Sequence, residues 1–313
     1  MSKVTELRPN LREELGKIID NDPALTQEAA GRQIGTSGTT ISRYLKGDYA
    51  GNVSELERKI SNWLRTYKQR TEDARALPNA PDWVATPSAE QIMGALEYAQ
   101  LAGDVVVIYG GAGTGKTETL DYFGRTRPNV WVITATPATA GVVPALEAVA
   151  EAVDIHVANG AARLHRAVVK RLAGTFGLLA IDEAQNLSTQ ALDQMRSIHD
   201  ATGCGLALLG NEKVYSSMTG GNRAAYLDRL YSRVGKKLRL TKVGNDDVDA
   251  IIDAWDVELK GCRRLLRSIA ASKGGLRNLT KVMRLSHMYA AGDQREVSCS
   301  DVAAAWKRIG GAA

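Results

Sequence analysis

Residues 105–117 read VVVIYGGAGTGKT, a run of five apolar residues followed directly by a glycine-rich loop that ends in Lys-Thr. The loop fits the pattern G-x-x-x-x-G-K-[ST], which binds phosphate when a strand precedes it and a helix follows. Glycines let the backbone wrap around phosphates with its N–H groups pointing inward, and the next helix presents its positive N-terminus. Because residues 118–123 suit a helix, the stretch predicts a nucleotide-binding strand, loop and helix.

The residues of this loop have separate chemical tasks under that interpretation. Lys116 would neutralise the β- and γ-phosphates, and the hydroxyl of Thr117 would bind Mg²⁺. The residues expected around the phosphates are Gly110, Gly111, Ala112, Gly113, Thr114, Gly115, Lys116, Thr117 and Glu118. ATP and Mg²⁺ are therefore the expected cofactors.

Two further apolar runs end in polar residues. In LLAIDE, residues 178–183, Asp182 would hold Mg²⁺ through water, and Glu183 would orient the attacking water as a general base. In LALLGN, residues 206–211, the amide of Asn211 lies between the carboxylates and the γ-phosphate, or else it caps a helix. Because parallel strands end at one edge of a sheet, all three side chains are expected near the loop.

The surrounding sequence predicts an α/β fold. Five short runs read as strands, the first four nearly continuously apolar: 105–109, 130–134, 178–182, 206–210 and 237–240. Amphipathic segments separate them, which favours a five-stranded parallel sheet covered by helices on both faces. A helix is expected to start at Ser88, which has capping-box spacing with Gln91. After residue 240 the sequence favours four or five helices.

The first 69 residues read as short helices, and residues 26–46 look like a helix-turn-helix with Gly35 at the turn. The residues expected to be buried are Ala29, Ala30, Ile34, Ile41 and Leu45. Residues 37–45 would form the recognition helix. The residues left to face DNA are Thr39, Thr40, Ser42, Arg43 and Lys46. A small helical protein-interaction domain of the same shape is the alternative.

Residues 70–87 contain three prolines among polar residues, a linker composition. The expected organisation is a helix-turn-helix domain over residues 1–69, this linker, an ATPase core over 88–240 and a C-terminal helical domain over 241–313.

Basic residues gather in two places near the expected site. In residues 222–239, Arg229 and Arg233 could reach the nucleotide of a neighbouring subunit, or they belong to a solvated basic face. Arg277 opens an amphipathic helix after two glycines and could reach the triphosphate, unless the glycines only separate two helices. These arginines are therefore candidates for catalysis and nucleotide binding.

In this order, the phosphate loop, the Asp-Glu strand, the Asn-ended strand, the arginine segment and the G-x-x-R helix resemble the AAA+ ATPases. Within that group the chain resembles the ATP-dependent transposition B proteins of Mu-like bacteriophages, through GGAGTGKTET, NVWVITATP, IDEAQNL, LLGNEKVYSSMTGGNR and the leading helix-turn-helix. The resemblance implies an AAA+ core with a C-terminal helical lid and a DNA-stimulated ATPase that polymerises on duplex DNA. It also implies delivery of that DNA to a transposase, stimulation of strand transfer, and a place in the host bacterial cytoplasm.

Two surfaces of the core could contact DNA under this resemblance. Four basic residues, Arg163, Arg166, Lys170 and Arg171, precede the Asp-Glu strand, three of them at helical spacing. A solvated charged face is the alternative for them. The segment 134–141 follows the second strand, and Thr136 and Thr139 could contact phosphates there.

The net charge of +5 is spread unevenly over the 313 residues. Residues 1–75 hold 13 basic and 11 acidic side chains and residues 241–313 hold 12 and 9, whereas residues 76–240 hold 15 of each. Bulk attraction is therefore too weak to dominate DNA binding. No apolar run approaches the roughly 20 residues of a membrane helix, so no membrane partner is expected.

The three cysteines are far apart in the sequence and odd in number, and they are expected to form neither a disulfide framework nor a zinc site. Two other functions share the same ATPase. One is a replication initiator or helicase loader, and the other is a nucleotide-switched transcription regulator that binds one operator. The protein partner and the DNA footprint distinguish these alternatives.

Overall fold

The computed structural model describes residues 11–22, 25–76, 81–156, 160–219, 228, 230–255 and 260–311. The chain divides into two compact units, Met1–Pro78 and Asn79–Ala313. None of the helices within the described ranges combines the length and the apolar character that a membrane crossing requires.

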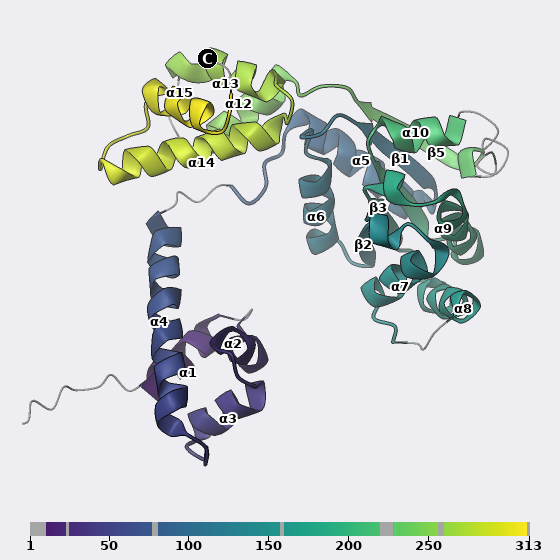
Figure 1. Ribbon diagram of the computed structural model, residues 1–313. Coiled ribbons are helices and arrows are strands. Elements are labelled where there is room, and N and C mark those ends of the chain that lie inside the picture. The colour runs from purple at the N-terminus through teal and green to yellow at the C-terminus, as the bar shows by residue number, and fades with distance from the viewer. Residues whose placement is uncertain are drawn as a thin grey trace, which may run out of the picture. The chain divides into compact units, whose positions relative to one another are not determined.

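The first unit consists of helices (Figure 1), and these are α1 (Leu11–Asn21), α2 (Gln27–Ile34), α3 (Gly38–Lys46) and α4 (Val53–Ala76). Thr26 and Ser37 cap α2 and α3 through their side chains, and Gly35 ends α2 with a positive φ of 79°. A Cβ on Gly31 would lie 2.8 Å from the backbone nitrogen of Gly38, so glycine lets the two helices meet closely. The expected helix-turn-helix is therefore α2, a short turn and α3.

The core of this unit differs from the prediction at three residues. The residues buried as predicted are Ala30, Ile34 and Ile41. Ala29 and Leu45, which were predicted to be buried, are only half-buried. Tyr44, which was not predicted to be buried, lies in the core. Tyr44 can be buried because its hydroxyl donates to Oε1 of Glu57 at 3.2 Å. Burial, together with this carboxylate, raises the pKa of Tyr44 to about 12.

Helix α4 continues to Ala76, so residues 70–76, expected to open the linker, are helical instead. The reason is local. The stretch RTEDARA contains no glycine or proline, and the first helix breaker after it is Pro78.

Among the residues that the structure describes, the second unit has α5 (Pro87–Ala102) followed by five strands. The strands are β1 (Val105–Gly110), β2 (Val130–Thr134), β3 (Leu178–Asp182), β4 (Gly205–Gly210) and β5 (Val234–Leu240). They form one sheet in the order β2-β3-β4-β1-β5, and every neighbouring pair is parallel. The predicted five-stranded parallel sheet is therefore confirmed.

Helices cover both faces of this sheet (Figure 1). On one face lie α5 and α6 (Lys116–Thr126), against strand residues such as Val106 and Ile108. On the other lie α7 (Val142–Ala152), α8 (Ala161–Leu172) and α9 (Thr189–Thr202), against Val105 and Val107. Because every residue of β1 is buried, its sequence is continuously apolar rather than alternating.

Helix α5 starts two residues earlier than predicted. Thr86 is its N-cap, with its side chain accepting from the backbone N–H of Ala89, and Pro87 occupies the first turn. Ser88, expected as the cap, instead donates its backbone N–H and its hydroxyl to Asp247. Proline is favoured at the first helical position, which places the cap immediately before it.

The C-terminal helices pack around their own apolar cluster within the second unit. They are α12 (Asn245–Ala254), α13 (Arg263–Ala271), α14 (Leu276–Gly292) and α15 (Cys299–Arg308), with the short helix η3 (Lys260–Cys262) between α12 and α13. The expectation for the cysteines was wrong in one respect, because Cys262 and Cys299 form a disulfide with their Cα atoms 5.5 Å apart. The fold brings η3 to the start of α15, which their separation of 37 residues does not reveal. Cys204 is buried and free.

Candidate nucleotide-binding site

The glycine-rich loop leaves the carboxyl end of β1 and leads into α6. Gly110, Gly113 and Gly115 have positive φ angles of 144°, 76° and 87°. A Cβ on Gly110 would lie 1.9 Å from the carbonyl oxygen of Leu240, and one on Gly113 would lie 2.0 Å from that of Gly274. The loop conformation and its contacts with β5 and the C-terminal helices therefore require glycine.

Lys116 begins α6 and folds back over the loop. Its Nζ donates to the carbonyl oxygens of Gly110 at 3.1 Å and Gly111 at 2.7 Å, and to Oγ1 of Thr114 at 3.2 Å. Burial lowers the pKa of Lys116, while the charges of Asp182, Glu183 and Glu212 act in the opposite direction. The lysine thus sits at the centre of the loop with acidic residues close enough to affect it.

Thr117 and Asp182 meet across the loop. The Thr117 hydroxyl donates to Oδ2 of Asp182 at 2.6 Å, and the carboxylate is only 3% exposed. The other oxygen of Asp182 accepts the backbone N–H of Glu183 at 2.9 Å. Hydroxyl and carboxylate oxygens are hard ligands of the kind that Mg²⁺ prefers, so this pair fits the expected cation.

Glu183 follows β3 in a left-handed conformation, with φ of 53°, and its side chain is exposed. The amide nitrogen of Gln185 donates to Oε2 of Glu183. The amide oxygen of Gln185 accepts the backbone N–H of Asn211 at 3.1 Å. Gln185 therefore ties the Glu183 carboxylate to the end of β4, and the sequence analysis missed it. The short helix η2 (Ala184–Asn186) positions this glutamine, and only its closeness to the Asp-Glu pair in the sequence could have suggested it.

Asn211 follows β4 at the same edge of the sheet. Its Oδ1 accepts the backbone N–H of Lys213 at 2.8 Å, at the start of α10 (Glu212–Thr219). Of the two interpretations of Asn211, the helix cap is the one that its side chain makes in this structure.

The C-terminal helices touch the phosphate loop at the start of α14. The backbone N–H of Leu276 donates to the carbonyl oxygen of Gly113 at 2.9 Å. Arg277 is the next residue, and its side chain is exposed. Its position in the first turn of α14 therefore brings the start of its side chain beside the loop.

Arg233 lies at the opposite edge of the sheet from the loop. Val234 pairs with Val105 at the start of β1, and Leu240 pairs with Gly110 at its end. Six residues of strand separate the two edges by about 20 Å, so Arg233 is remote from the phosphate loop of the same chain. Its Nε donates to Oδ1 of Asp200 at 2.5 Å. Arg229 lies outside the described residues.

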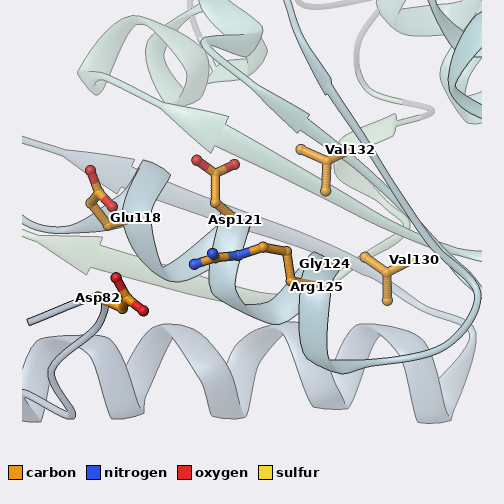
Figure 2. Close-up of a pocket in the computed structure, with 7 residues that line it drawn as sticks. All are labelled: Asp82, Glu118, Asp121, Gly124, Arg125, Val130 and Val132. Atoms are coloured by element: carbon orange, nitrogen blue, oxygen red, sulfur yellow. The ribbon is translucent and has the colours of Figure 1, made fainter. Parts of the chain in front are cut away.

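An open groove lies between α6 and the edge strand β2 (Figure 2). Its lining residues are Asp82, Glu118, Asp121, Gly124, Arg125, Val130 and Val132. Burial, and next the nearby Asp182, raises the pKa of Asp121. Glu118, expected among the phosphate-binding residues, is exposed and faces this groove.

The expected DNA-contacting side chains lie in both units, and each unit is described by itself. In the first unit, Thr39, Arg43 and Lys46 are exposed on α3, whereas Thr40 and Ser42 are half-buried. The Thr40 hydroxyl also shares a hydrogen bond of 2.9 Å with the capping Ser37. Of the residues predicted to contact DNA from α3, the exposed Thr39, Arg43 and Lys46 are therefore the ones accessible to it.

Within the second unit, η1 (Pro137–Thr139) follows β2 at the loop edge of the sheet. Thr136 and Thr139 cap this short helix mutually, each side chain accepting the other's backbone N–H. The four basic residues of α8, namely Arg163, Arg166, Lys170 and Arg171, are all exposed. The opposite face of α8 buries Leu164, Val168 and Leu172, as the spacing predicts.

Parts of the chain match two described families. Residues 101–218 match a family described as AAA domain, and residues 232–309 match one described as Mu B transposition protein, C terminal. The chain is also similar to the ATP-dependent target DNA activator B of Escherichia phage Mu, 36% identical over 299 residues, which are 94% of this chain and 92% of that protein. The protein of the same name from Escherichia phage D108 has the same identity and coverage.

The chain is similar as well to the Mu-like prophage FluMu DNA transposition protein B of Haemophilus influenzae. The identity is 33% over 266 residues, 83% of this chain and 91% of that protein. Among solved structures, domain III of the replication initiation protein DnaA of Thermotoga maritima matches with a TM-score of 0.50 at 18% identity, covering 72% of this chain and 94% of that one. At that identity the likeness concerns the fold alone.

Proposed function

The chain belongs to the family of the ATP-dependent target DNA activators B of Mu-like phages, and from that premise we propose that it assembles on duplex DNA with ATP and delivers that DNA to a transposase. It is an ATPase of the AAA group. The observation that carries the proposal is the similarity to these activators over 94% of the chain. In this proposal DNA stimulates hydrolysis, and the assembly stimulates strand transfer in the cytoplasm of a bacterial host.

The nucleotide site supports this proposal through its own residues. Lys116 would exchange the loop carbonyls that it now contacts for the β- and γ-phosphates of ATP. Thr117 and Asp182 would hold Mg²⁺, which when bound neutralises charge on the phosphates. Arg277 would reach the triphosphate from the first turn of α14.

Hydrolysis in this site would depend on Glu183 and its neighbours. The exposed Glu183 carboxylate would orient and deprotonate the attacking water. Gln185 would fix the direction of that carboxylate, since it also bonds to the end of β4. Asn211 would act at the γ-phosphate only if its side chain left its cap of α10.

The site is completed by a second subunit in this proposal. Arg233 is about 20 Å from the phosphate loop of its own chain, so it can stabilise transition-state charge only on a neighbour's nucleotide. Its ion pair with Asp200 would then have to open when the subunits dock. Arg229 is the alternative candidate for the same role.

Mixing of subunits tests the arginine proposal. Arg233→Ala should lower ATPase activity, and mixing with Lys116→Ala subunits should partly restore it. Such mixtures form some interfaces with an intact loop on one side and an intact arginine on the other. Mixtures that stay as inactive as their components would refute action across the interface, and Arg229→Ala provides the parallel measurement.

DNA binding in this proposal relies on assembly rather than on bulk charge. Residues 76–240 have no net charge, so each subunit offers only a few contacts to phosphates. The proposed contacts are the exposed residues of α3, Thr136 and Thr139 at η1, and the four exposed basic residues of α8. Many weak backbone contacts, multiplied by ATP-dependent polymerisation, would bind duplex DNA without reading its sequence.

Electron microscopy of the chain with ATP and random duplex DNA tests the proposal as a whole. Filaments are expected with the unaltered chain and not with Lys116→Ala. Footprinting on the same DNA should show uniform protection. Protection of one operator would instead support a transcription regulator, and stable capture of a replicative helicase in place of a transposase would support a loader.

A further inference from the structure

We propose that Asp247 is a positioning residue for the nucleotide site, because its carboxylate fixes the C-terminal helical lid, residues 241–311, to the start of α5. The inference rests on the proposed ATP site and adds a residue that the loop and strand motifs do not contain. Asp247 lies in the lid, whereas the loop that it would serve lies in the sheet-containing part of the same unit.

The Asp247 carboxylate joins two helix N-termini. One oxygen accepts the backbone N–H of Ser88 at 2.8 Å, and the other accepts the Ser88 hydroxyl at 2.7 Å. The second oxygen also accepts the backbone N–H of Gly244 at 2.9 Å, at the N-cap of α12. Both helices therefore direct their positive ends and free N–H groups at one anion.

Burial makes this junction sensitive to change. Asp247 is only 3% exposed, and a buried carboxylate is stable only when hydrogen bonds replace its water. Four residues, 241–244, connect β5 to α12, and Val243 and Val84 pack against the apolar cluster of the lid. The carboxylate is thus a buried polar link between the start of α5 and the lid.

The same lid also reaches the phosphate loop. Leu276 donates its backbone N–H to Gly113, and a Cβ on Gly275 would lie 2.6 Å from the carbonyl oxygen of Gly113. Val248 of α12 and Leu276 of α14 belong to one buried cluster, so the two helices move together. A shift of α12 at Asp247 therefore moves the start of α14, including Arg277, relative to the loop.

The chain contains a matched control for this carboxylate. Asp301 is also buried, at 5% exposure, and caps the start of a lid helix, since both the N–H and the hydroxyl of Ser298 donate to it. The Asp301 carboxylate also accepts hydrogen bonds from the guanidinium of Arg295, which is in the lid as well. Asp301 therefore resembles Asp247 in burial and in local geometry, but its bonds remain within the lid.

The test compares Asp247→Asn, Asp301→Asn and Ser88→Ala in the full chain, with a fluorescent ATP analogue as the probe and circular dichroism as the folding check. Asp247→Asn should weaken nucleotide affinity about tenfold, because a buried charge-assisted hydrogen bond contributes about that factor or more. Ser88→Ala, which keeps its backbone bond and leaves the carboxylate intact, should weaken it less. Asp301→Asn should lower the melting temperature and leave the affinity of the folded protein unchanged.

Rates of amide hydrogen exchange provide a second measurement, which distinguishes a local change at the phosphate loop from general destabilisation. Asp247→Asn should speed exchange at the Leu276 amide, which bonds to Gly113, whereas Asp301→Asn should speed exchange in α15. Equal losses of affinity in both Asn variants, or no loss in Asp247→Asn and Ser88→Ala, would overturn the inference. Lys116→Ala keeps the two proposals apart: if it still binds the analogue, the ATP site itself is wrong, whatever Asp247 does.

Discussion

Substitution of Gly113 by alanine should separate the lid from the phosphate loop. The added Cβ would lie 2.0 Å from the carbonyl oxygen of Gly274 and 3.0 Å from the Cα of Gly275. Both atoms belong to the backbone, so no side chain can turn aside, and the start of α14 has to withdraw by about 1 Å or more. The same substitution places alanine at a φ of 76°.

The two costs can be estimated. A left-handed alanine costs about 1–2 kcal/mol, and a forced overlap in a packed region typically costs about 1–3 kcal/mol. Gly113→Ala should therefore lower the free energy of unfolding of the second unit by about 2–5 kcal/mol. Gly111→Ala is the matched control, because its φ is not positive and its Cβ would meet nothing closer than 3.6 Å. That change should cost less than about 0.5 kcal/mol.

Urea unfolding followed by tryptophan fluorescence measures the difference without nucleotide. In a Trp63→Phe background the remaining tryptophans, Trp83, Trp131, Trp255 and Trp306, all belong to the second unit, so the signal reports that unit alone. If the Gly113→Ala and Gly111→Ala proteins unfold at the same urea concentration, the backbone contact between loop and lid does not contribute to stability as predicted.

Three further predictions concern hydrolysis, the disulfide and pH. Glu183→Gln should bind ATP normally, hydrolyse it at least about 100-fold more slowly and dissociate slowly from DNA, and unchanged turnover would remove Glu183 from its proposed role. The cysteines of the Cys262–Cys299 disulfide are 37 residues apart, so its reduction should lower the free energy of unfolding by about 4 kcal/mol relative to the disulfide-bonded protein. Thiol titration of unfolded, unreduced protein should find one free cysteine, and finding three would contradict that pairing. Burial lowers the pKa of His287, whose Nε2 is buried and has no hydrogen-bond partner among the described residues. Because the unfolded state then binds more protons, stability should fall as the pH drops through about 6.5, and His287→Gln should flatten this part of the melting-temperature profile.

The strands and the phosphate loop follow from local rules. The runs 130–134 and 178–182 match β2 and β3 residue for residue. Every residue of β3 is buried, and a strand buried on both faces requires a continuously apolar sequence, whereas the edge strand β2 is mostly half-buried. The loop follows from steric demands that only glycine meets. The closeness of Thr117 and Asp182 could also be predicted from the sequence, since parallel strands bring their carboxyl ends to one edge of the sheet.

The features that the sequence did not reveal depend on contacts between distant segments. Ser88 has the spacing of a capping residue, but its partner is Asp247, 159 residues away. Gln185 gains its place only because β4 lies beside β3. The disulfide and the Arg233–Asp200 pair likewise join segments whose closeness no periodicity encodes. Local sequence patterns therefore predict the helices, the strands and the edge of the sheet at which polar residues gather. Contacts between residues that are far apart in the sequence are known only from the structure.

The placement of the phosphate loop and Arg233 at opposite edges of the sheet gives the subunit a direction. A contact that brings one subunit's arginine to the next subunit's nucleotide is head-to-tail, and repetition yields a ring or an open helix rather than a symmetric dimer. An open assembly of this kind has two unlike ends. At one end a nucleotide lacks the neighbour's arginine, and at the other an arginine has no nucleotide to serve. Terminal subunits would therefore differ in ATP lifetime from interior ones, and the assembly should grow and shorten with a polarity set within each chain.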